Sequence, residues 1–227
     1  GEVISQAFSI TGGLTSASVD IELGAGSDYA GRSGIVVSVT DLFNAGVSTS
    51  DGYGYIALPD IAPEDLTIRG TNRRDNLEGG LGNDTISGRG GNDTIHGYAG
   101  RDTLRGNARN DRLYGDEGND RLFGGGGRDN LRGGANNDFL SGDGGRDTLT
   151  GGRGHDRFNF KRGDGNDTIT DFDIDQDFIK IGRGANDFAD LTFETSGSDV
   201  VVSFANVEIT VENIAIGDLQ NADLFIL

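Results

Sequence analysis

An aspartate recurs every nine residues along the middle of this chain, always in the same local pattern. Residues 79–97, GGLGNDTISGRGGNDTIHG, show two copies, in each of which glycine comes first, aspartate sixth and an aliphatic residue eighth. Ten such units run without interruption through residues 70–159. Their aspartates are Asp75, Asp84, Asp93, Asp102, Asp111, Asp120, Asp129, Asp138, Asp147 and Asp156. Carboxylates in glycine-rich turns supply oxygen ligands, which suit a hard cation rather than zinc.

The nine-residue spacing predicts that these aspartates form columns. If two units make one coil of 18 residues, Asp84 lies over Asp102 on one edge and Asp75 lies over Asp93 on the other, roughly 4.8 Å apart. Carboxylates stacked in this way repel each other unless a cation lies between them. Two carboxylates and the nearby turn carbonyls offer a six-oxygen cage that suits Ca²⁺, whereas Mg²⁺ prefers to retain waters. The four gaps on each edge predict up to about eight Ca²⁺ ions.

The glycines and aliphatic residues of the units predict the elements that position these carboxylates. Glycine reaches positive φ without steric cost, so each aspartate is expected to lie in a tight turn. The aliphatic residue two positions later points to the same side of an extended segment. These residues are Leu77, Ile86, Ile95, Leu104, Leu113, Leu122, Leu131, Leu140, Leu149 and Phe158. The pattern predicts an all-β fold, in which each unit contributes a turn of about six residues and a strand of about three.

The composition excludes several classes of protein. Only 34% of the 227 residues are hydrophobic and 40 are glycine, which is little material for one conventional core. The absence of cysteine excludes disulfides and thiolate metal sites. No apolar stretch is long enough to cross a membrane. The net charge of −18 argues against nucleic acid as a partner and favours cations.

The charge is distributed unevenly along the chain. Residues 70–159 contain 14 acidic residues and 13 arginines with no lysine, whereas residues 1–69 and 160–227 carry net charges of −7 and −10. The sequence leaves two explanations of these arginines open. They pair with the acidic flanks, or, once Ca²⁺ neutralises the aspartates, their planar guanidinium groups bind an anionic polysaccharide or lipopolysaccharide.

The segment after the units contains the same residue types but no longer repeats every nine residues. Residues 163–174, GDGNDTITDFDI, predict one more turn, in which Asp164 or Asp167 closes the last gap of a column. The alternating aspartates of residues 171–177 are interpreted as one solvated face of a strand. Alternating apolar residues from Asp199 onward predict a hairpin, which belongs to a small β cap over the end of the repeats.

The array of units resembles the RTX (repeats-in-toxin) calcium-binding β-roll. The resemblance implies a right-handed parallel β-roll, in which Ca²⁺ is bound by the aspartates and by backbone carbonyls near positions two and four of each turn. The glycines at position four are Gly82, Gly91, Gly100, Gly118, Gly127, Gly145 and Gly154. The other units have Arg73, Arg109 and Asn136 at this position.

The last five residues, DLFIL, resemble the C-terminal export signal of RTX proteases and lipases. A plain core strand is the structural alternative. The resemblance implies a secreted protein that leaves a Gram-negative bacterium through a type I (ABC-transporter) secretion apparatus and folds on extracellular Ca²⁺. We expect a monomer.

We expect three parts in the chain. Residues 1–69 form a β-rich segment or the tail of an upstream domain, residues 70–170 form the calcium-binding roll, and residues 171–227 form the β cap with the secretion signal. No catalytic motif is found, since His96 and His155 lack metalloprotease spacing. We therefore expect no enzymatic activity from this chain. Because it has no methionine, we expect a mature or excised fragment. An alternative to the calcium-binding module alone is the C-terminal part of an exoenzyme, with catalysis in an upstream domain or within residues 1–69.

Overall fold

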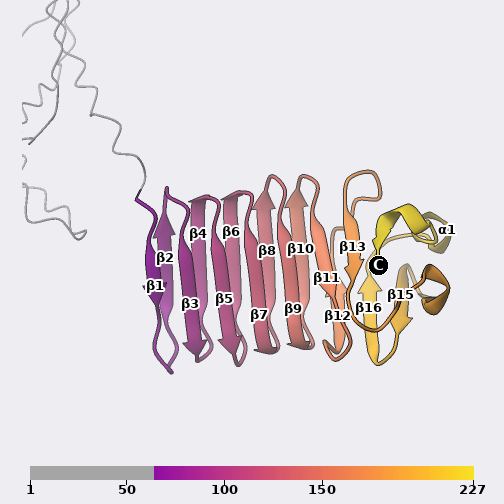
Figure 1. Ribbon diagram of the computed structural model, residues 1–227, viewed down its shortest axis with the longest axis horizontal. Coiled ribbons are helices and arrows are strands. Elements are labelled where there is room, and N and C mark those ends of the chain that lie inside the picture. Colours follow the sequence, from indigo (N-terminus) through magenta and orange to yellow (C-terminus); the bar gives the residue numbers. More distant parts are fainter. Residues whose placement is uncertain (1–63) are drawn as a thin grey trace, which may run out of the picture. The chain divides into compact units, whose positions relative to one another are not determined.

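The computed structural model describes residues 64–227, which form two facing sheets of stacked strands and a small C-terminal cap (Figure 1). The strands of one sheet, the odd sheet, are β1 (Thr67–Arg69), β3 (Thr85–Gly90), β5 (Thr103–Ala108), β7 (Arg121–Gly127), β9 (Phe139–Gly145), β11 (Arg157–Phe160), β13 (Phe178–Ile181) and β17 (Phe225–Ile226), in this order. The other, the even sheet, contains β2 (Asn76–Gly80), β4 (Thr94–Gly100), β6 (Arg112–Gly118), β8 (Asn130–Ala135), β10 (Thr148–Arg153) and β12 (Asn166–Ile169), followed by β16 (Val207–Val211), β15 (Asp199–Phe204) and β14 (Thr192–Ser196). Successive repeat strands therefore alternate between two parallel sheets, and the predicted all-β roll is confirmed.

The register within each sheet follows the repeat. Ile86 of β3 pairs with Leu104 of β5, which in turn pairs with Leu122 of β7. Each coil therefore contains 18 residues, as the nine-residue period predicts. Toward the C-terminus the spacing lengthens, because Thr148 of β10 pairs with Thr168 of β12.

The interior of the roll contains three kinds of residue on each strand. Asp84, Ile86 and Gly88 alternate with exposed or half-buried residues and are all buried, as are their equivalents in the following strands. The aliphatic residues from Ile86 to Leu149 have exposed fractions of 0%. The strands of the middle repeats are six or seven residues long instead of the expected three, because pairing continues through the glycines that follow the aliphatic residue.

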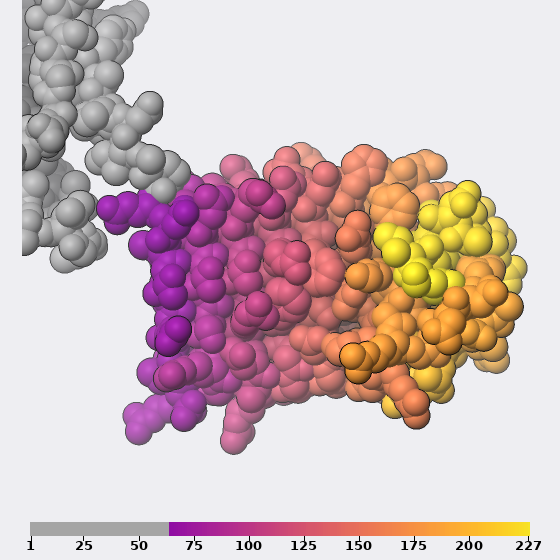
Figure 2. Space-filling model, viewed as in Figure 1, coloured from indigo at the N-terminus to yellow at the C-terminus, as the bar shows by residue number. Residues whose placement is uncertain are grey.

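The hairpin strands of the cap each bury three apolar side chains, more than the repeat strands of the roll. The predicted hairpin is confirmed, since β15 pairs antiparallel with β16, and β14 pairs with β15. Short helices at Phe188–Asp190 (η1), Ile216–Leu219 (α1) and Ala222–Leu224 (η2) complete the cap. Phe188, Phe193 and Phe225 pack together with ring centroids 5.4–5.8 Å apart. Figure 2 shows the cap, in orange and yellow, covering the C-terminal end of the roll.

The cap is joined to the roll through both sheets. Strand β16 pairs with β12 in the even sheet, and the C-terminal strand β17 pairs with β13 in the odd sheet. The C-terminal hydrophobic residues thus form a short strand, with Phe225 only 8% exposed and Leu227 46% exposed. None of the helices in residues 64–227 is long and apolar enough to span a membrane. Of the segment expected at residues 1–69, residues 1–63 lie outside the described residues, and Thr67–Arg69 form β1, which pairs with β3 of the roll.

The interpretation of the acidic residues 171–177 as a strand face is wrong. These residues form a bend and a turn between β12 and β13, with Asp173 and Asp175 exposed. Asp177 is instead buried, with an exposed fraction of 3%. The turn returns the chain to the odd sheet, where β13 pairs with β11.

Candidate calcium-binding turns

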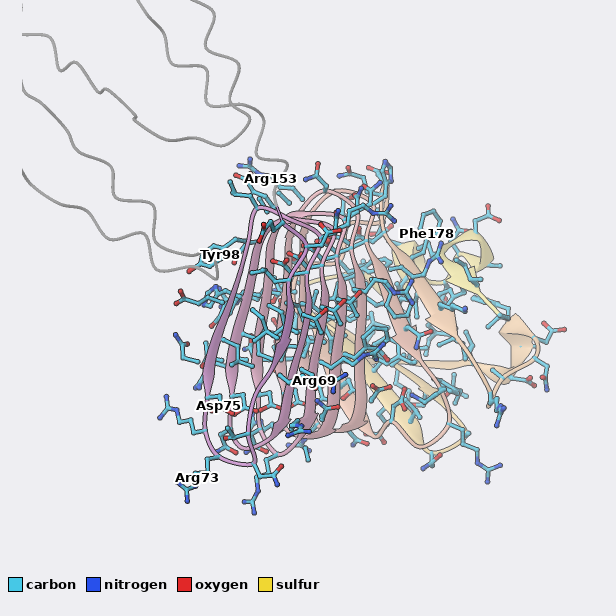
Figure 3. All side chains as sticks on the ribbon, turned by 60° about the vertical axis from the view of Figure 1, so that its left-hand side comes forward. Arg69, Arg73, Asp75, Tyr98, Arg153 and Phe178 are labelled. Atoms are coloured by element: carbon cyan, nitrogen blue, oxygen red, sulfur yellow. The ribbon has the colours of Figure 1, made fainter. Side chains whose placement is uncertain are left out.

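Each repeat aspartate lies where the chain leaves a turn and enters a strand. Asp102 directly precedes β5, and Asp120 directly precedes β7. The exposed fraction is 3% or less for Asp84, Asp93, Asp102, Asp111, Asp120, Asp129, Asp138, Asp147 and Asp156. In Figure 3 Asp75 lies at one edge of the roll, and Tyr98 and Arg153 lie near the opposite edge. The carboxylates are therefore enclosed along both edges.

Backbone hydrogen bonds hold these carboxylates in two columns. The N–H of Asp84 donates to Oδ1 of Asp102 at 2.7 Å, and the N–H of Asp102 donates to Oδ1 of Asp120 at 2.8 Å. Equivalent bonds link Asp120, Asp138, Asp156 and Asp177 on this edge, and Asp75, Asp93, Asp111, Asp129, Asp147 and Asp167 on the other. The structure thus places aspartates of successive coils over one another, as the repeat spacing predicts.

The second oxygen of these carboxylates has no hydrogen-bond donor. Oδ2 is buried and unpaired in Asp84, Asp93, Asp102, Asp111, Asp120, Asp129, Asp138, Asp147, Asp156 and Asp167. A buried carboxylate oxygen without a partner is strongly unfavourable. No lysine or arginine of residues 64–227 forms an ion pair with any of these groups. Two columns of unpaired negative oxygens are therefore available to bind cations.

The first glycine of each unit leaves space beside the unpaired oxygen. A Cβ placed on Gly115 would lie 2.5 Å from Oδ2 of Asp120 and 2.5 Å from the carbonyl oxygen of Gly133. A side chain at this position would therefore collide with both atoms. Because Gly133 belongs to the next coil, a carboxylate oxygen from one coil and a carbonyl oxygen from the next converge here, and the same arrangement is found in the turns from Gly79 to Gly133.

Carbonyl oxygens of position four also point toward the next coil. A Cβ on Gly100, where φ is +131°, would collide with the carbonyl oxygen of Gly82. Among the predicted position-four glycines, Gly91, Gly100, Gly118, Gly127, Gly145 and Gly154 all have φ between +131° and +154°. The carbonyls of Arg73, Arg109 and Asn136 face the position-four glycine of the next coil in the same way. The three units without glycine therefore keep the carbonyl direction.

Burial of the columns raises the pKa of their carboxyl groups. Desolvation is the largest cause, and the negative charge of neighbouring aspartates adds to it. The pKa is raised from 3.8 to about 6 for Asp102 and Asp156, to about 7 for Asp111, Asp120, Asp129, Asp147 and Asp167, and to about 8 for Asp138. A column without a cation therefore retains protons near neutral pH, and a bound cation must displace them.

The ends of the columns differ from their middles. Oδ2 of Asp75 accepts the N–H of Thr71 at 2.6 Å, so this predicted ligand already has a donor. Asp164 accepts the N–H of Lys161 at 2.8 Å and pairs with its Nζ at 3.2 Å. Of the two candidates for closing the last gap, Asp167 has the unpaired oxygen and Asp164 stands outside the column.

Asp177 is a column residue that the sequence reading missed. Its Oδ1 accepts the N–H of Asp156 at 2.9 Å, and its Oδ2 accepts the N–H of Asp173 at 2.9 Å. The sequence does contain the repeat pattern here, because Asp177-Phe178-Ile179 has the same order of aspartate, variable residue and apolar residue as the units. The longer insertion before Asp177 concealed it, since 21 rather than 18 residues separate Asp156 from Asp177.

A second series of hydrogen bonds between coils, made by the residues at position five of the units, was not predicted from the sequence. The N–H of Arg101 donates to Oδ1 of Asn83 at 2.9 Å, and the N–H of His155 donates to Oδ1 of Asn137 at 2.8 Å. These bonds join turns of successive coils at the solvent-exposed side of each aspartate column. They run in the opposite direction to the aspartate bonds, because here the side chain of the earlier coil is the acceptor.

The sequence profile of the RTX calcium-binding nonapeptide repeat family matches residues 69–104, 96–131 and 123–158. Residues 69–158 are RTX calcium-binding repeats. A search of curated proteins gave no significant match.

The solved structures similar to this chain include three of bacterial proteins, two of them subunits of one enzyme. The chain is 26% identical to the AlgE6R3 subunit of the Azotobacter vinelandii mannuronan C5-epimerase (81% of this chain, 86% of that one, TM-score 0.32) and 24% identical to the AlgE6R2 subunit (74% and 94%, TM-score 0.34). It is 16% identical to the extracellular lipase LipA from Serratia marcescens, covering 72% of this chain and 40% of the lipase, with a TM-score of 0.33. The chain thus spans less than half of the lipase. At these TM-scores the similarities carry no argument about function.

The residues of the RTX roll fit Ca²⁺. Within residues 64–227 no three acidic, histidine or cysteine side chains converge on one point, so a cage needs backbone carbonyls as well as carboxylates. The structure supplies both, because an unpaired Oδ2 atom and a glycine carbonyl lie close together in the seven turns that begin at Gly79, Gly88, Gly97, Gly106, Gly115, Gly124 and Gly133. Bound Ca²⁺ would neutralise the buried carboxylates and join adjacent coils. The aspartates would bind the ion, and the glycines would leave room for it.

Proposed function

We propose that this chain is a calcium-driven folding module of a secreted protein. The observation that carries the proposal is the set of ten buried, unpaired Oδ2 atoms in two columns. With little free Ca²⁺, repulsion and desolvation of these carboxylates oppose folding of the glycine-rich roll. At the higher Ca²⁺ concentration outside a cell, up to about eight ions fill the columns, and their binding free energy becomes folding free energy.

We further propose that this switch serves type I secretion. An unfolded, glycine-rich chain suits passage through a narrow exporter, and the folded roll forms only after release. The C-terminal strand β17 pairs with β13, so folding would bury a terminus that an exporter must reach first. Any catalytic activity of the whole protein would then belong to a domain outside residues 64–227, since the RTX roll itself is a calcium-binding scaffold.

A calcium titration followed by circular dichroism tests the folding switch. We expect the β signal of the full chain to be small in EGTA and to rise cooperatively as Ca²⁺ is added. Asp120→Asn, which weakens two adjacent gaps of one column, should raise the midpoint concentration several-fold. Asp218→Asn, at an exposed position of α1, is the matched control and should leave the midpoint unchanged. The same β signal in EGTA and in Ca²⁺ would refute the proposal.

An export assay tests the secretion role separately. A reporter without a signal peptide, joined to the N-terminus of this chain, should reach the medium only from cells with a type I exporter. Export should not require Ca²⁺ inside the cell, whereas folding of the released chain should require Ca²⁺ outside. Equal release without the exporter would overturn the secretion role and leave the folding switch intact.

A second role is favoured by the arginines of the roll. Residues 64–227 contain 16 arginines, and the ion pairs in this segment are His96–Asp116, Lys161–Asp143 and Lys161–Asp164. The first explanation of the arginines, that they pair with the acidic flanks, is therefore wrong for the carboxylates of residues 64–227. We propose that the calcium-loaded roll binds an anionic polymer through these unpaired guanidinium groups.

A further inference from the structure

The outer faces of the two sheets differ in charge. On the odd sheet, the outward positions of β1 to β13 that flank the buried apolar residues include Arg69, Arg105, Arg121, Arg157 and Lys180, and none of these positions is acidic. On the even sheet, the equivalent positions include Arg112 and Arg132, but also Glu78 and Glu208. These flanking positions therefore make a strongly basic surface on the odd sheet, whereas those of the even sheet are close to neutral. Farther along the odd sheet, Asp143 of β9 is paired with Lys161.

The arginines in the middle of the odd face are held over aromatic rings. The guanidinium of Arg105 lies 4.4 Å from the ring centroid of Phe123, and that of Arg121 lies 4.9 Å from the ring centroid of Phe139. These contacts fix the guanidinium groups and leave their N–H edges free to donate. The rings are half-buried, so the face offers oriented cations rather than an apolar patch.

The basic face continues into a hollow at the junction with the cap. The hollow is lined by Asn159, Lys161, Arg162, Lys180, Arg183 and Asn186. These include all four basic residues of the otherwise acidic residues 160–227. Lys161 is engaged by Asp143 and Asp164, but Arg162, Lys180 and Arg183 have no ion-pair partner within residues 64–227. Asn159 and Lys180 also lie on the odd face, so the two features are continuous.

From this arrangement we infer that the odd face binds a linear polysaccharide that carries carboxylates, with one end of the polymer in the basic hollow. This inference rests on the second proposed role, binding of an anionic polymer. Arg121 on β7 and Arg157 on β11 are two strands apart, which is about 10 Å along the stack. An extended polymer with regularly spaced carboxylates matches such a row of cations, and each guanidinium can bind a carboxylate with two hydrogen bonds.

A lipid surface fits this face less well. Membrane binding by a sheet face needs exposed apolar side chains that enter the bilayer boundary. Of the large hydrophobic residues that are exposed in residues 64–227, only Phe178, at 36%, lies on the odd face. Phe123 and Phe139 are covered by guanidinium groups instead. The face therefore suits a hydrated polymer better than lipopolysaccharide vesicles.

The test compares matched pairs of arginines on the two faces of the full chain. Arg105→Gln with Arg121→Gln removes two charges from neighbouring strands of the odd sheet, and Arg112→Gln with Arg132→Gln removes two from neighbouring strands of the even sheet. Circular dichroism in Ca²⁺ first shows that each variant folds. Binding of fluorescent oligogalacturonates too short to gel with Ca²⁺ is then measured at saturating Ca²⁺ and low salt.

We expect the odd-face variant to bind about a hundredfold more weakly, which is roughly tenfold for each bidentate contact, and the even-face variant to bind like the parent chain. Binding should weaken with salt, and neutral dextran should not bind. Lys180→Gln with Arg183→Gln should weaken binding of the longer oligomers in particular. Equal losses in both face variants, absence of binding by a folded parent chain, or a preference for lipopolysaccharide vesicles would each overturn the inference. None of these outcomes would affect calcium-driven folding, which the dichroism measures independently.

Discussion

The RTX roll and the C-terminal cap are built from similar strands but enclose different interiors. From the second unit onward, each repeat unit of the roll buries one apolar side chain on its strand and the aspartate just before that strand, as Leu122 and Asp120 show. The cap strands β15 and β16 bury Val200, Val202, Phe204, Val207, Ile209 and Val211 instead. The ten buried, unpaired carboxylate oxygens of residues 64–227 all lie in the roll, the last at Asp167, and residues 171–227 contain no buried carboxylate oxygen without a partner.

Because their interiors differ, the roll and the cap have different sources of stability. The cap buries three apolar side chains from each strand of its hairpin and adds a cluster of three phenylalanine rings. Burial of apolar surface is the usual driving force of folding. The roll has a thin apolar core and must also offset the cost of buried negative charge. A cation that neutralises this charge therefore decides whether the roll folds, whereas it has no direct role in the cap.

Removal of Ca²⁺ should have the largest effect, and it should separate the two regions. In EGTA, we expect the amides of β5 and β7 to lose hydrogen-exchange protection by several orders of magnitude, because their coils would carry unneutralised carboxylates. The amides of β15 and β16 should lose much less. Exchange followed by mass spectrometry measures both regions in one sample. An equal loss in β7 and β15 would mean that roll and cap unfold as one unit and would contradict the comparison.

Change of pH without Ca²⁺ should have the next largest effect, again in the roll. The pKa of Asp111, Asp120 and Asp129 is raised from 3.8 to about 7, so the folded roll binds more protons than the unfolded chain between these values. Stability is therefore fully present below about pH 4 and is lost as the pH rises through 7.

The measurement is circular dichroism and thermal unfolding in EGTA between pH 4 and pH 8. The β signal of the roll, and its melting temperature at each pH where it is folded, should fall as the pH rises, so the small β signal expected in EGTA applies near neutral pH. In Ca²⁺ the direction should reverse, because protons compete with the cation for the same carboxylates. Calcium-free stability that increases from pH 4 to pH 8 would show that the buried carboxylates are not the groups that destabilise the roll.

The period of the roll could be predicted from the sequence because the key positions of the nine-residue unit each have one structural role. An aspartate, an aliphatic residue and a glycine recur at fixed offsets, and the offsets determine which side chains face inward and which coils are neighbours. The stacking of Asp84 over Asp102 follows from the 18-residue length of a coil alone. The cap hairpin could be predicted for the same reason, since alternation from Val200 to Val211 has period two.

Features that depend on one particular partner could not be predicted in this way. Oδ2 of Asp75 is satisfied by the backbone N–H and the hydroxyl of Thr71, the only threonine at position two among the ten units. Asp177 joins a column only because residues 171–176 turn back toward the odd sheet. The basic odd face depends on which arginines share a sheet, and a linear count of arginines does not distinguish the two faces.

Replacing one glycine of the roll and one glycine of the cap with alanine should have a smaller effect, and it should again separate the two regions. In Gly100→Ala the new Cβ would collide with the carbonyl of Gly82, and φ of +131° is unfavourable for alanine. We expect a loss of about 3 kcal/mol, which raises the Ca²⁺ midpoint about twofold if about eight ions bind together. Gly217→Ala in α1 meets no atom within 4 Å and should stabilise the cap slightly. Calcium titrations of both variants measure the difference, and a similar midpoint in the two variants would contradict it.

The smallest expected effect concerns single asparagine side chains. Asn137→Ala removes the acceptor of the His155 N–H, and Asn221→Ala removes the acceptor of the Asp223 N–H, so each variant loses one exposed hydrogen bond. Each loss is about 1 kcal/mol. In the roll this loss is shared among all the ions that bind with folding, so the Ca²⁺ midpoint of Asn137→Ala should rise by only about a quarter if about eight ions bind together. In the cap the loss is not linked to Ca²⁺, and Asn221→Ala should keep the parent midpoint while its melting temperature falls. If both variants shifted the midpoint equally, the cap would have to fold with the roll, and the two interiors would not be energetically separate.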